Sequence, residues 1–384
     1  MNTTIVIPTY NEKDNIGPML EELQKVFKKI TDFNMSVLVV DDNSPDGTAD
    51  IVRSAMKKNK NIHLITGEKQ GLGAAYIRGF KYAMKDLKAD VIFEMDADFQ
   101  HNPNDIPRFL DKISSGYDYV LGSRYISGGS IPKTWGLHRK FLSFFGGWFA
   151  RVVLGTKNVI DYTTGYKATR VKGFLDKLDL SDILSKNFAY KIHLLYEMLN
   201  LKAKTIEIPI NFVDREKEKS KSNALREFKE SMKVVLILRY RKNQRFFKVC
   251  IVGAIGAVIQ YVLFFTLKSI PAFREISWLG LSYKTLANAI SVEIALLSNF
   301  FINNFWTFSD KKIISFKSLL LKLPQFNILS LGSVFIQAAV MEIGTRLIPL
   351  DSNLIDFGLV ALGILIGLIW NFTMYTRVVW KTHK

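Results

Sequence analysis

The chain has 384 residues, which is long for a single domain, so two or more domains are expected. Its formal charge of +17, from 52 Lys and Arg against 35 Asp and Glu, favours an anionic partner such as a membrane lipid or a nucleotide. Nucleic acid is disfavoured because the sequence has no zinc-finger spacing, helix-turn-helix pattern or aromatic RNA-binding box. The single cysteine, Cys250, excludes a disulfide framework and a thiolate metal site.

Residues 1–243 and 244–384 differ in composition. The first part mixes charged and apolar residues, whereas the second consists of long apolar runs with charges gathered in short clusters. This contrast predicts a soluble domain followed by a membrane-embedded domain. No signal peptide precedes the first predicted strand, so the soluble domain is expected to stay in the cytosol.

Short runs rich in β-branched residues alternate with longer helical patterns in the first 100 or so residues. Helices are expected over Asn15–Lys29, after Thr48, and over Gly71–Lys85. Strands are expected over Thr3–Pro8, Ser36–Val40, His63–Thr66 and Val91–Met95. This alternation with short links predicts an α/β domain with a mostly parallel sheet.

The strand over Val91–Met95 ends in Asp96, Ala97 and Asp98, and Gln100 follows closely. Two carboxylates one residue apart at a strand end can face one hard cation, to which an amide oxygen can add a neutral ligand. This set suits Mg²⁺ or Mn²⁺, which favour oxygen ligands and share their shell with substrate phosphates. The alternative is that both carboxylates only solvate the end of the strand.

Tyr10, Asp42 and Asp46 also follow strands, and ligands of such sheets bind outside the carboxyl ends of the strands. The acid-rich loop after the second strand could accept hydrogen bonds from a base and a ribose, with Asp42 as the acceptor. The alternative for Asp42 is to cap the next helix. Neither GxGxxG after the first strand nor GxxxxGK(S/T) occurs, which argues against a dinucleotide oxidoreductase and a P-loop enzyme.

Several further motifs occur in order along roughly the first 240 residues. They are Pro8–Glu12, Val40–Thr48, Gly71–Ala75, Met95–His101, Gly122–Tyr125, Arg139–Lys140 with Ser143, Thr164–Lys167, and Phe212–Arg215 with Ser220–Lys221. Together they resemble the polyprenyl phosphate mannose synthases of glycosyltransferase family 2. The resemblance implies the GT-A fold, a Rossmann-like α/β domain that binds nucleotide sugars.

The resemblance also implies roles for individual residues. Asp96, Asp98 and Gln100 would hold a divalent ion on the donor diphosphate. Arg124, Arg139 and Ser143 would hold the acceptor and donor phosphates, and Asp98, Arg124 and Arg139 would form the catalytic set. The nucleotide sugar would be bound by Pro8, Tyr10, Glu12, Val40, Asp42, Asp96, Ala97, Asp98, Gln100, Arg124, Arg215 and Lys221.

Arg215 and Lys221 would close over the bound nucleotide. The alternative for their segment, residues 214–223, is a solvated linker. The family usually has Gly-Glu-Ser-Lys here, whereas this chain has Glu218-Lys219-Ser220-Lys221. Without this glycine, the closed geometry of the loop and the contact of Lys221 are not expected to match those of the family in full.

The expected acceptor needs no general base. A polyprenyl monophosphate has a second pKa of about 6 and is largely dianionic at neutral pH, whereas a sugar hydroxyl would have to lose a proton. We therefore expect direct in-line attack on the anomeric carbon, with inversion and without a covalent intermediate. Asp161 is the reserve candidate if a base is required.

Two segments combine basic residues with apolar ones in a way typical of helices in the headgroup layer of a membrane. They span about residues 135–156 and 224–242. The alternative is that either helix packs on the soluble domain as ordinary core. The apolar face predicted for the second helix consists of Phe228, Met232, Val235 and Leu236.

Four apolar stretches lie at about residues 249–267, 285–308, 323–341 and 357–376, and each nears the roughly 20 residues that span a bilayer. Basic clusters before the first, between the second and third, and after the fourth predict both termini in the cytoplasm. Glu293, inside the second stretch, is expected to face protein or water.

The end of the second stretch, Asn299–Phe308, resembles a pattern of GtrA-like membrane domains, Asn-Phe-x-x-Asn-Arg-x-Trp-Thr-Phe, with Asn304 in place of the arginine. A faint similarity between Asn299–Trp306 and Asn371–Trp380 indicates a duplicated helical hairpin.

These resemblances imply a metal-dependent glycosyltransferase with a GT-A domain and an all-α domain of four transmembrane helices. It would transfer one mannose from GDP-mannose to polyprenyl (dolichyl) phosphate. Transfer of glucose from UDP-glucose is the alternative donor chemistry, and a processive polysaccharide synthase is disfavoured because Gln-x-x-Arg-Trp is absent. From a different class, the four-helix half could flip the lipid-linked sugar. A plain anchor that also forms homo-oligomers is the simpler alternative.

Overall fold

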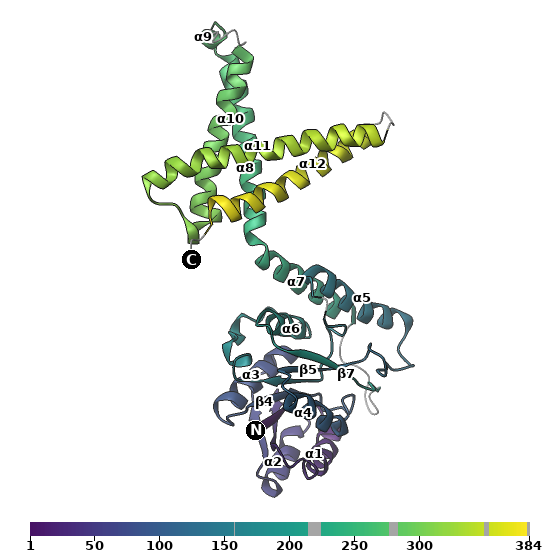
Figure 1. Cartoon of the computed structure of the whole chain (residues 1–384). Helices are drawn as coiled ribbons and strands as arrows, with labels where there is room; N and C mark the ends of the chain where they lie inside the picture. Colours follow the sequence, from purple (N-terminus) through teal and green to yellow (C-terminus); the bar gives the residue numbers. More distant parts are fainter. Residues whose placement is uncertain (157, 214–223, 276–282, 349–352, 382–384) are drawn as a thin grey trace. The chain divides into compact units, whose positions relative to one another are not determined.

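The computed structural model (Figure 1) describes residues 1–384 except 157, 214–223, 276–282, 349–352 and 382–384. The chain forms two compact units, Met1–Arg239 and Tyr240–Lys384. All strands in the described part of the chain lie in the first unit, and the described elements of the second unit are helical.

A seven-stranded sheet forms the centre of the first unit, in the order β3-β2-β1-β4-β6-β5-β7. Only β6 runs antiparallel to its neighbours in this sheet. The strands are β1 (Asn2–Thr9), β2 (Asn34–Asp41), β3 (Ile62–Thr66), β4 (Val91–Glu94), β5 (Tyr119–Ser123), β6 (Lys167–Arg170) and β7 (Thr205–Pro209). The predicted mostly parallel α/β fold is confirmed, and the four expected strands agree with the observed ones to within two residues.

Successive residues of a strand point to opposite faces, and both faces of this sheet are covered. Ile5 and Ile7 lie in one core, while Val6 lies in the other. The first core is closed by α1 (Lys13–Phe27), α2 (Thr48–Lys58) and α4 (Ile106–Ser114), and the second by α3 (Leu72–Lys85) and α6 (Tyr190–Asn200) (Figure 1). Short 3₁₀ turns span Pro103–Asp105, Leu175–Lys177 and Leu180–Asp182.

Helix α3 packs closely on the sheet at Gly79, where an added Cβ would lie 2.4 Å from Val6 Cγ1 and 3.0 Å from Val40 Cγ2. Gly79→Ala is therefore expected to destabilise the domain by about 1–3 kcal/mol, measured as a lower melting temperature. Gly17→Ala on α1 is the control. Its Cβ would meet only Ile51 Cγ2, at 3.5 Å, and alanine favours a helix, so stability should stay equal or rise slightly. Equal melting temperatures of the two variants would contradict this account of the packing.

Two helices follow the amphipathic segments of the sequence, α5 (Leu137–Leu154) and α7 (Ala224–Lys242). Helix α5 buries small residues and Leu154, and its opposite side exposes a stripe of large apolar side chains. This stripe consists of Leu137, Phe141, Phe144, Trp148 and Val152. Their spacing of three or four residues puts them on one face of the helix, where they form an exposed apolar surface.

Helix α7 differs from its prediction. Val234, Val235 and Leu238 are buried in a core with α5 and α6, whereas Leu236 is 55 % exposed. Of the predicted apolar face, Val235 therefore lies in this core and Phe228 contacts Phe145 of α5, whereas Leu236 lies outside it. The alternative of ordinary core packing holds for this side of α7. Contact of α5 or α7 with a membrane stays a prediction.

The described residues of the second unit include four helices that are long and apolar enough to cross a membrane, over Gln244–Ser269, Leu286–Thr307, Phe316–Gly344 and Ala361–Val379. The helical elements are α8 (Gln244–Ser269), α9 (Pro271–Arg274), α10 (Tyr283–Ile302), α11 (Phe316–Leu347) and α12 (Asn353–Met374), with a 3₁₀ turn at Ser309–Lys311. Helices α8 and α10 run side by side, as do α11 and α12 (Figure 1). The predicted all-α region of four candidate membrane helices is confirmed.

The two helix pairs end alike. A π-helical turn over Asn303–Thr307 follows α10, and another over Tyr375–Val379 follows α12. The residues after these turns, Phe308 and Trp380, stack with ring centroids 4.4 Å apart. This repeated ending supports the duplicated hairpin that the sequence indicates. Glu293 is an exposed residue of α10 whose Oε1 accepts a hydrogen bond from Asn327 Nδ2 of α11 at 3.0 Å, and its expected orientation toward protein or water stays a prediction.

Candidate functional site

The predicted site residues gather at one edge of the sheet. The carboxyl ends of β1, β2, β4, β5 and β7 lie at the same edge as the amino end of the antiparallel β6. Pro8 pairs with Val40 across β1 and β2, and Glu94, just before the acidic loop, pairs with Lys167 at the start of β6. Loops from six strands can therefore contribute to one site.

The loop after β4 carries Asp96, Ala97, Asp98 and Gln100, with the backbone of Phe99 in the left-handed region at φ +61°. Asp96 Oδ1 accepts a hydrogen bond from the Tyr76 hydroxyl at 3.0 Å. Asp98 is 5 % exposed, and its Oδ1 accepts from the backbone N–H of Gln100 at 3.2 Å. These contacts fix the two carboxylates against the end of the sheet.

His101 holds the same loop through its backbone. Its Nδ1 accepts a hydrogen bond from the backbone N–H of Asp96 at 3.0 Å, and its ring stacks on Tyr166 with centroids 4.9 Å apart. Burial lowers the pKa of His101 to about 4, so the ring is neutral at pH 7 and Nδ1 is free of a proton. His101 therefore positions the backbone that carries the carboxylates.

The lowered pKa of His101 makes stability depend on pH. Between about pH 4 and 6.5 the unfolded chain binds a proton that the folded chain does not, so stability should fall as pH falls through this range. The expected loss is up to about 3 kcal/mol. His101→Asn, whose amide oxygen can replace Nδ1 and does not titrate, should show a flatter dependence. Melting temperatures of both proteins across this range test the expectation, and parallel curves would contradict it.

The loop fits a hard divalent cation by its chemistry. Asp96, Asp98 and Gln100 offer only oxygen ligands, and Gln100 Nε2 donates to the carbonyl of Val213 at 3.2 Å, which leaves Oε1 to face a cation. Within the described residues, no three His, Cys, Asp or Glu side chains form a metal-binding group by themselves. Water and substrate phosphates would therefore have to complete the coordination shell, as is usual for Mg²⁺.

The loops after β1 and β2 are tied together. The backbone N–H of Asn11 donates to Ser44 Oγ, and that of Glu12 donates to Thr48 Oγ1, both at 3.0 Å. The Nζ atom of Lys69 lies 3.3 Å from the centre of the Tyr10 ring. The fold thus brings the predicted nucleoside residues of the two loops side by side.

Asp42 is buried at this edge, and its Oδ1 accepts a hydrogen bond from Arg78 Nη2 at 2.6 Å. Burial raises the pKa of Asp42, and the Arg78 guanidinium opposes this change only in part. Helix α2 has Gly47 at its N-cap position and no side-chain cap. The alternative role of Asp42 as a helix cap is therefore wrong, and its role toward a nucleoside stays a prediction.

Arg124, directly after β5, forms a buried ion pair with Asp161. Its Nε and backbone N–H donate to Asp161 Oδ2 at 2.8 and 3.0 Å, and its Nη2 donates to Asp161 Oδ1 and Thr163 Oγ1, each at 2.7 Å. Burial alone would raise the pKa of Asp161, but the Arg124 guanidinium outweighs it and lowers the pKa. Asp161 therefore holds Arg124 in place and is poorly suited to take up a proton.

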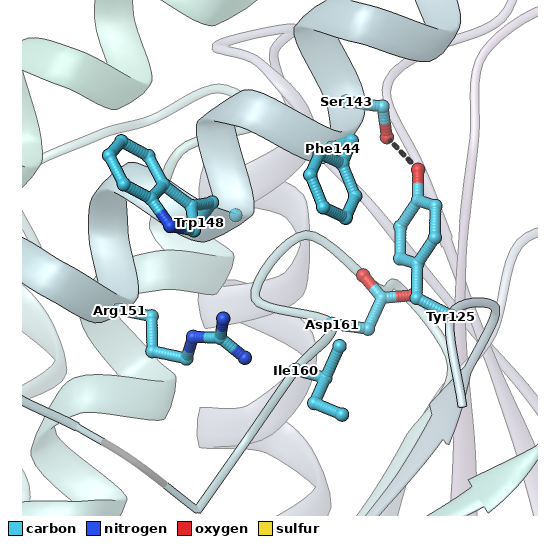
Figure 2. A pocket seen from close by; sticks show the side chains of 8 residues that line it. Tyr125, Ser143, Phe144, Trp148, Arg151, Ile160 and Asp161 are labelled. Carbon is cyan, nitrogen blue, oxygen red and sulfur yellow. Dashed lines mark hydrogen bonds between the residues drawn. The ribbon is translucent and has the colours of Figure 1, made fainter.

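A pocket lies beside this ion pair, between α5 and the loops that precede β6 and follow β5 (Figure 2). Its lining comprises Tyr125, Ser143, Phe144, Gly147, Trp148, Arg151, Ile160 and Asp161. The Tyr125 hydroxyl donates to Ser143 Oγ at 2.7 Å, and Phe144 and Trp148 line the wall formed by α5 (Figure 2). Arg139 is not part of the lining, and its guanidinium carbon lies 4.1 Å from the centre of the Trp135 ring.

The sequence analysis did not identify several residues that hydrogen-bond to the predicted site residues and hold them in place. Tyr76 and Arg78 of α3 contact Asp96 and Asp42, and Thr163 contacts Arg124. No local spacing could have identified them, because each is at least 20 residues from its partner. Arg215 and Lys221 lie outside the described residues, so their roles stay predictions.

Comparison with known families divides the chain in two. Residues 4–176 match the family Glycosyl transferase family 2, and residues 248–380 match the family GtrA/DPMS, transmembrane domain. The sheet edge described above, up to the start of β6, thus falls within a glycosyltransferase domain.

Three curated relatives are similar to this chain. It is 36 % identical over 222 residues to an undecaprenyl-phosphate mannosyltransferase of Micrococcus luteus, covering 58 % of this chain and 87 % of the relative. It is 36 % identical over 216 residues to a polyprenol monophosphomannose synthase of Mycolicibacterium smegmatis, covering 56 % and 78 %. It is 30 % identical over 386 residues to a dolichol-phosphate mannosyltransferase of Pyrococcus furiosus, covering 100 % of both chains.

The third relative aligns along its whole length, so the similarity includes both the catalytic and the membrane part. The two family matches occur in the same order as the two units of the fold. The resemblance drawn from the sequence motifs is confirmed. This chain is a glycosyltransferase that belongs to the polyprenyl phosphate mannose synthase family, with a family 2 catalytic domain and a GtrA/DPMS transmembrane domain.

Proposed function

We propose that this chain transfers a single mannose from GDP-mannose to a membrane polyprenyl phosphate, such as dolichyl phosphate. The observation that carries the proposal is the Arg124–Asp161 pair, which lies beside the α5 pocket on the same sheet edge as Asp96 and Asp98. A guanidinium held in place near the exposed apolar side chains of α5 suits an acceptor with a phosphate head and a hydrocarbon tail. The names of the three relatives support mannose and a polyprenyl phosphate acceptor.

The proposed reaction is in-line attack of an acceptor phosphate oxygen on the anomeric carbon, with inversion. The acceptor is already anionic at neutral pH, since its second pKa is about 6. The pairing of Asp161 with Arg124 agrees with a mechanism that has no general base at this position. Arg124 and Ser143 would orient the acceptor phosphate, with Arg139 approaching it from α5.

The donor would bind along the loops of β1, β2 and β4. Pro8, Tyr10, Glu12 and Asp42 would hold the nucleoside, and Arg215 and Lys221 would cover it. Held by Asp96, Asp98 and Gln100, Mg²⁺ or Mn²⁺ would supply neutralisation of the charge that builds on the leaving diphosphate. The oxygen-only donor set of this loop supports that assignment.

We further propose that residues 1–243 form the catalytic domain and residues 244–384 the membrane domain. The apolar stripe of α5 would contact the bilayer, where the lipid acceptor resides. Basic clusters at Arg239–Lys248, Lys311–Lys322 and Arg377–Lys384 support a cytoplasmic catalytic domain and cytoplasmic termini.

A donor panel tests the proposal. Purified full-length chain is incubated with polyprenyl phosphate, Mg²⁺ or Mn²⁺, and one radiolabelled nucleotide sugar at a time. Chloroform-soluble label from GDP-mannose, lost with a chelator, is the expected result. Label from UDP-glucose instead would keep the mechanism and replace the donor. Absence of lipid-linked label from every donor would overturn the proposal.

Transport by the membrane unit is a second candidate, and its polar interior is the observation that favours it. Among the described residues, the buried Oδ1 atoms of Asn299, Asn303 and Asn371 have no hydrogen-bond partner, which is unusual for a plain apolar anchor. Vesicles loaded with preformed polyprenyl phosphate mannose in one leaflet separate the two functions. Only a flippase would move the lipid to the other leaflet, and an unchanged distribution would leave the unit as an anchor.

A further inference from the structure

A buried lysine lies at the same sheet edge and belongs to none of the predicted sets. Lys191, near the start of α6, is 3 % exposed, and its ammonium is not sealed from solvent. Its Nζ lies 4.7 Å from the centre of the Phe188 ring. Within the described part of the chain, this ammonium has no hydrogen-bond acceptor and no carboxylate within ion-pair distance.

Gly165 makes room for this ammonium. A Cβ added at Gly165 would lie 2.5 Å from Lys191 Nζ and 3.1 Å from His101 Cε1. Gly165 lies in the loop that enters β6, two residues after Thr163, which binds Arg124. The ammonium therefore lies between the loop that supports Arg124 and the histidine that supports Asp96.

The neighbouring Lys167 provides the contrast. It is fully buried, but its Nζ lies 3.8 Å from Glu94 Oε2 and donates to the carbonyl of Lys191 at 3.4 Å. Glu94 Oε2 also accepts a hydrogen bond from the Tyr190 hydroxyl at 2.7 Å. Lys167 is thus compensated within the fold, whereas among the described residues the Lys191 ammonium has only the Phe188 ring as a partner.

Lys191 has lost much of its hydration without gaining a carboxylate partner, and an aromatic ring returns only part of the lost stabilisation. An anionic ligand that enters the site would remove the cost and gain a charge-assisted hydrogen bond.

We propose that Lys191 binds phosphate oxygens of a substrate, either in the diphosphate of the nucleotide sugar or in the monophosphate of the lipid acceptor. The inference rests on the proposed function for the identity of these substrates. Three observations support this inference. Gly165 leaves space beside the ammonium, no described carboxylate pairs with it, and it lies between His101 and the loop that contacts Arg124. Lys191 is thus a substrate-binding residue beyond those that the sequence motifs contain.

The test replaces Lys191 by methionine, whose unbranched side chain is one heavy atom shorter and carries no charge. The first arm measures binding of GDP with Mg²⁺ by calorimetry, and the second measures the KM for polyprenyl phosphate. We expect a weakening of about 10- to 100-fold in one arm, since a hydrogen bond to a charged group is lost. Weaker GDP binding assigns Lys191 to the donor, and a higher KM for the lipid assigns it to the acceptor. Lys177→Met, an exposed lysine in a surface turn, is the matched control and should change neither quantity.

Gly165→Ala provides a second variant that keeps the charge, because its methyl group would clash with the ammonium at 2.5 Å and meet His101 Cε1 only at 3.1 Å. It should weaken the same arm as Lys191→Met, and the double variant should be no weaker than Lys191→Met alone. It also decides the question if Lys191→Met does not fold. Values within twofold of the unchanged chain in both arms, for a folded variant, would overturn the inference. If the unchanged chain binds GDP but makes no lipid product, the proposed function fails while the first arm still tests Lys191.

Discussion

Asp98→Asn is expected to lower kcat for transfer by about 100- to 1,000-fold, with little change in the stability of the domain. The substitution keeps the shape of the side chain and its acceptor for the Gln100 N–H, but it removes one of the two negative charges of the loop. In the proposed mechanism, stabilisation of the leaving diphosphate would depend on that charge through a divalent cation held by the loop, and loss of one such contribution typically costs this much. Steady-state transfer with saturating GDP-mannose measures the effect.

Asp111→Asn is the matched control for this substitution, because Asp111 is exposed on α4 and belongs to the same domain. Its kcat should equal that of the unchanged chain. The Asp98→Asn variant should also need more metal for half-maximal activity. A kcat within threefold of the unchanged chain, at any metal concentration, would contradict the role given to the loop.

Arg124→Met is expected to remove transfer and to destabilise the domain by about 3–5 kcal/mol, because Asp161 is then a buried charge without a partner. In a domain of this size such a loss lowers the melting temperature by about 10 °C. Thermal melting of the full-length chain in detergent, together with the transfer assay, measures both effects.

The double variant Arg124→Met with Asp161→Asn separates structure from function. The amide oxygen can still accept from the backbone N–H of Arg124, the amide NH2 can donate to Thr163 Oγ1 in place of Oδ1, and no buried charge remains, so only the 3.3 Å contact with the Thr163 N–H is lost. Most of the stability should therefore return, while transfer should stay absent because no guanidinium meets the phosphate. A double variant as active as the unchanged chain would show that the pair serves only to hold the fold.

The strands and the acidic loop are predictable from sequence for a simple physical reason. The segment Val91–Met95 is apolar at every position except Glu94, as is typical of a strand buried on both faces. Because parallel strands end at one edge, Tyr10, Asp42 and Asp96 could be assigned to one site before their contacts were known. Arg124 and Ser143 were added to this site through the ordered motifs that resemble polyprenyl phosphate mannose synthases.

Other features depend on tertiary contacts that no local pattern contains. The Arg124–Asp161 pair joins residues 37 positions apart, and it changes Asp161 from a candidate base into a support for the guanidinium. The buried face of α7 is set by the core that α5 and α6 present, so its orientation could not follow from periodicity alone. In the sequence Lys191 is an ordinary residue of a predicted helix, and only the tertiary structure brings its ammonium close to Gly165 and His101.

Mass analysis of the lipid product tests the central claim most directly. Full-length chain in bilayer vesicles is incubated with GDP-mannose, polyprenyl phosphate and Mg²⁺, and the extracted lipid is examined for mass and for the anomeric configuration of its sugar. The account predicts a polyprenyl phosphate that is heavier by one hexose, with the anomeric configuration inverted relative to the donor, and no such product from Asp98→Asn. An unchanged lipid in the presence of folded protein, or a product with retained configuration, would contradict it.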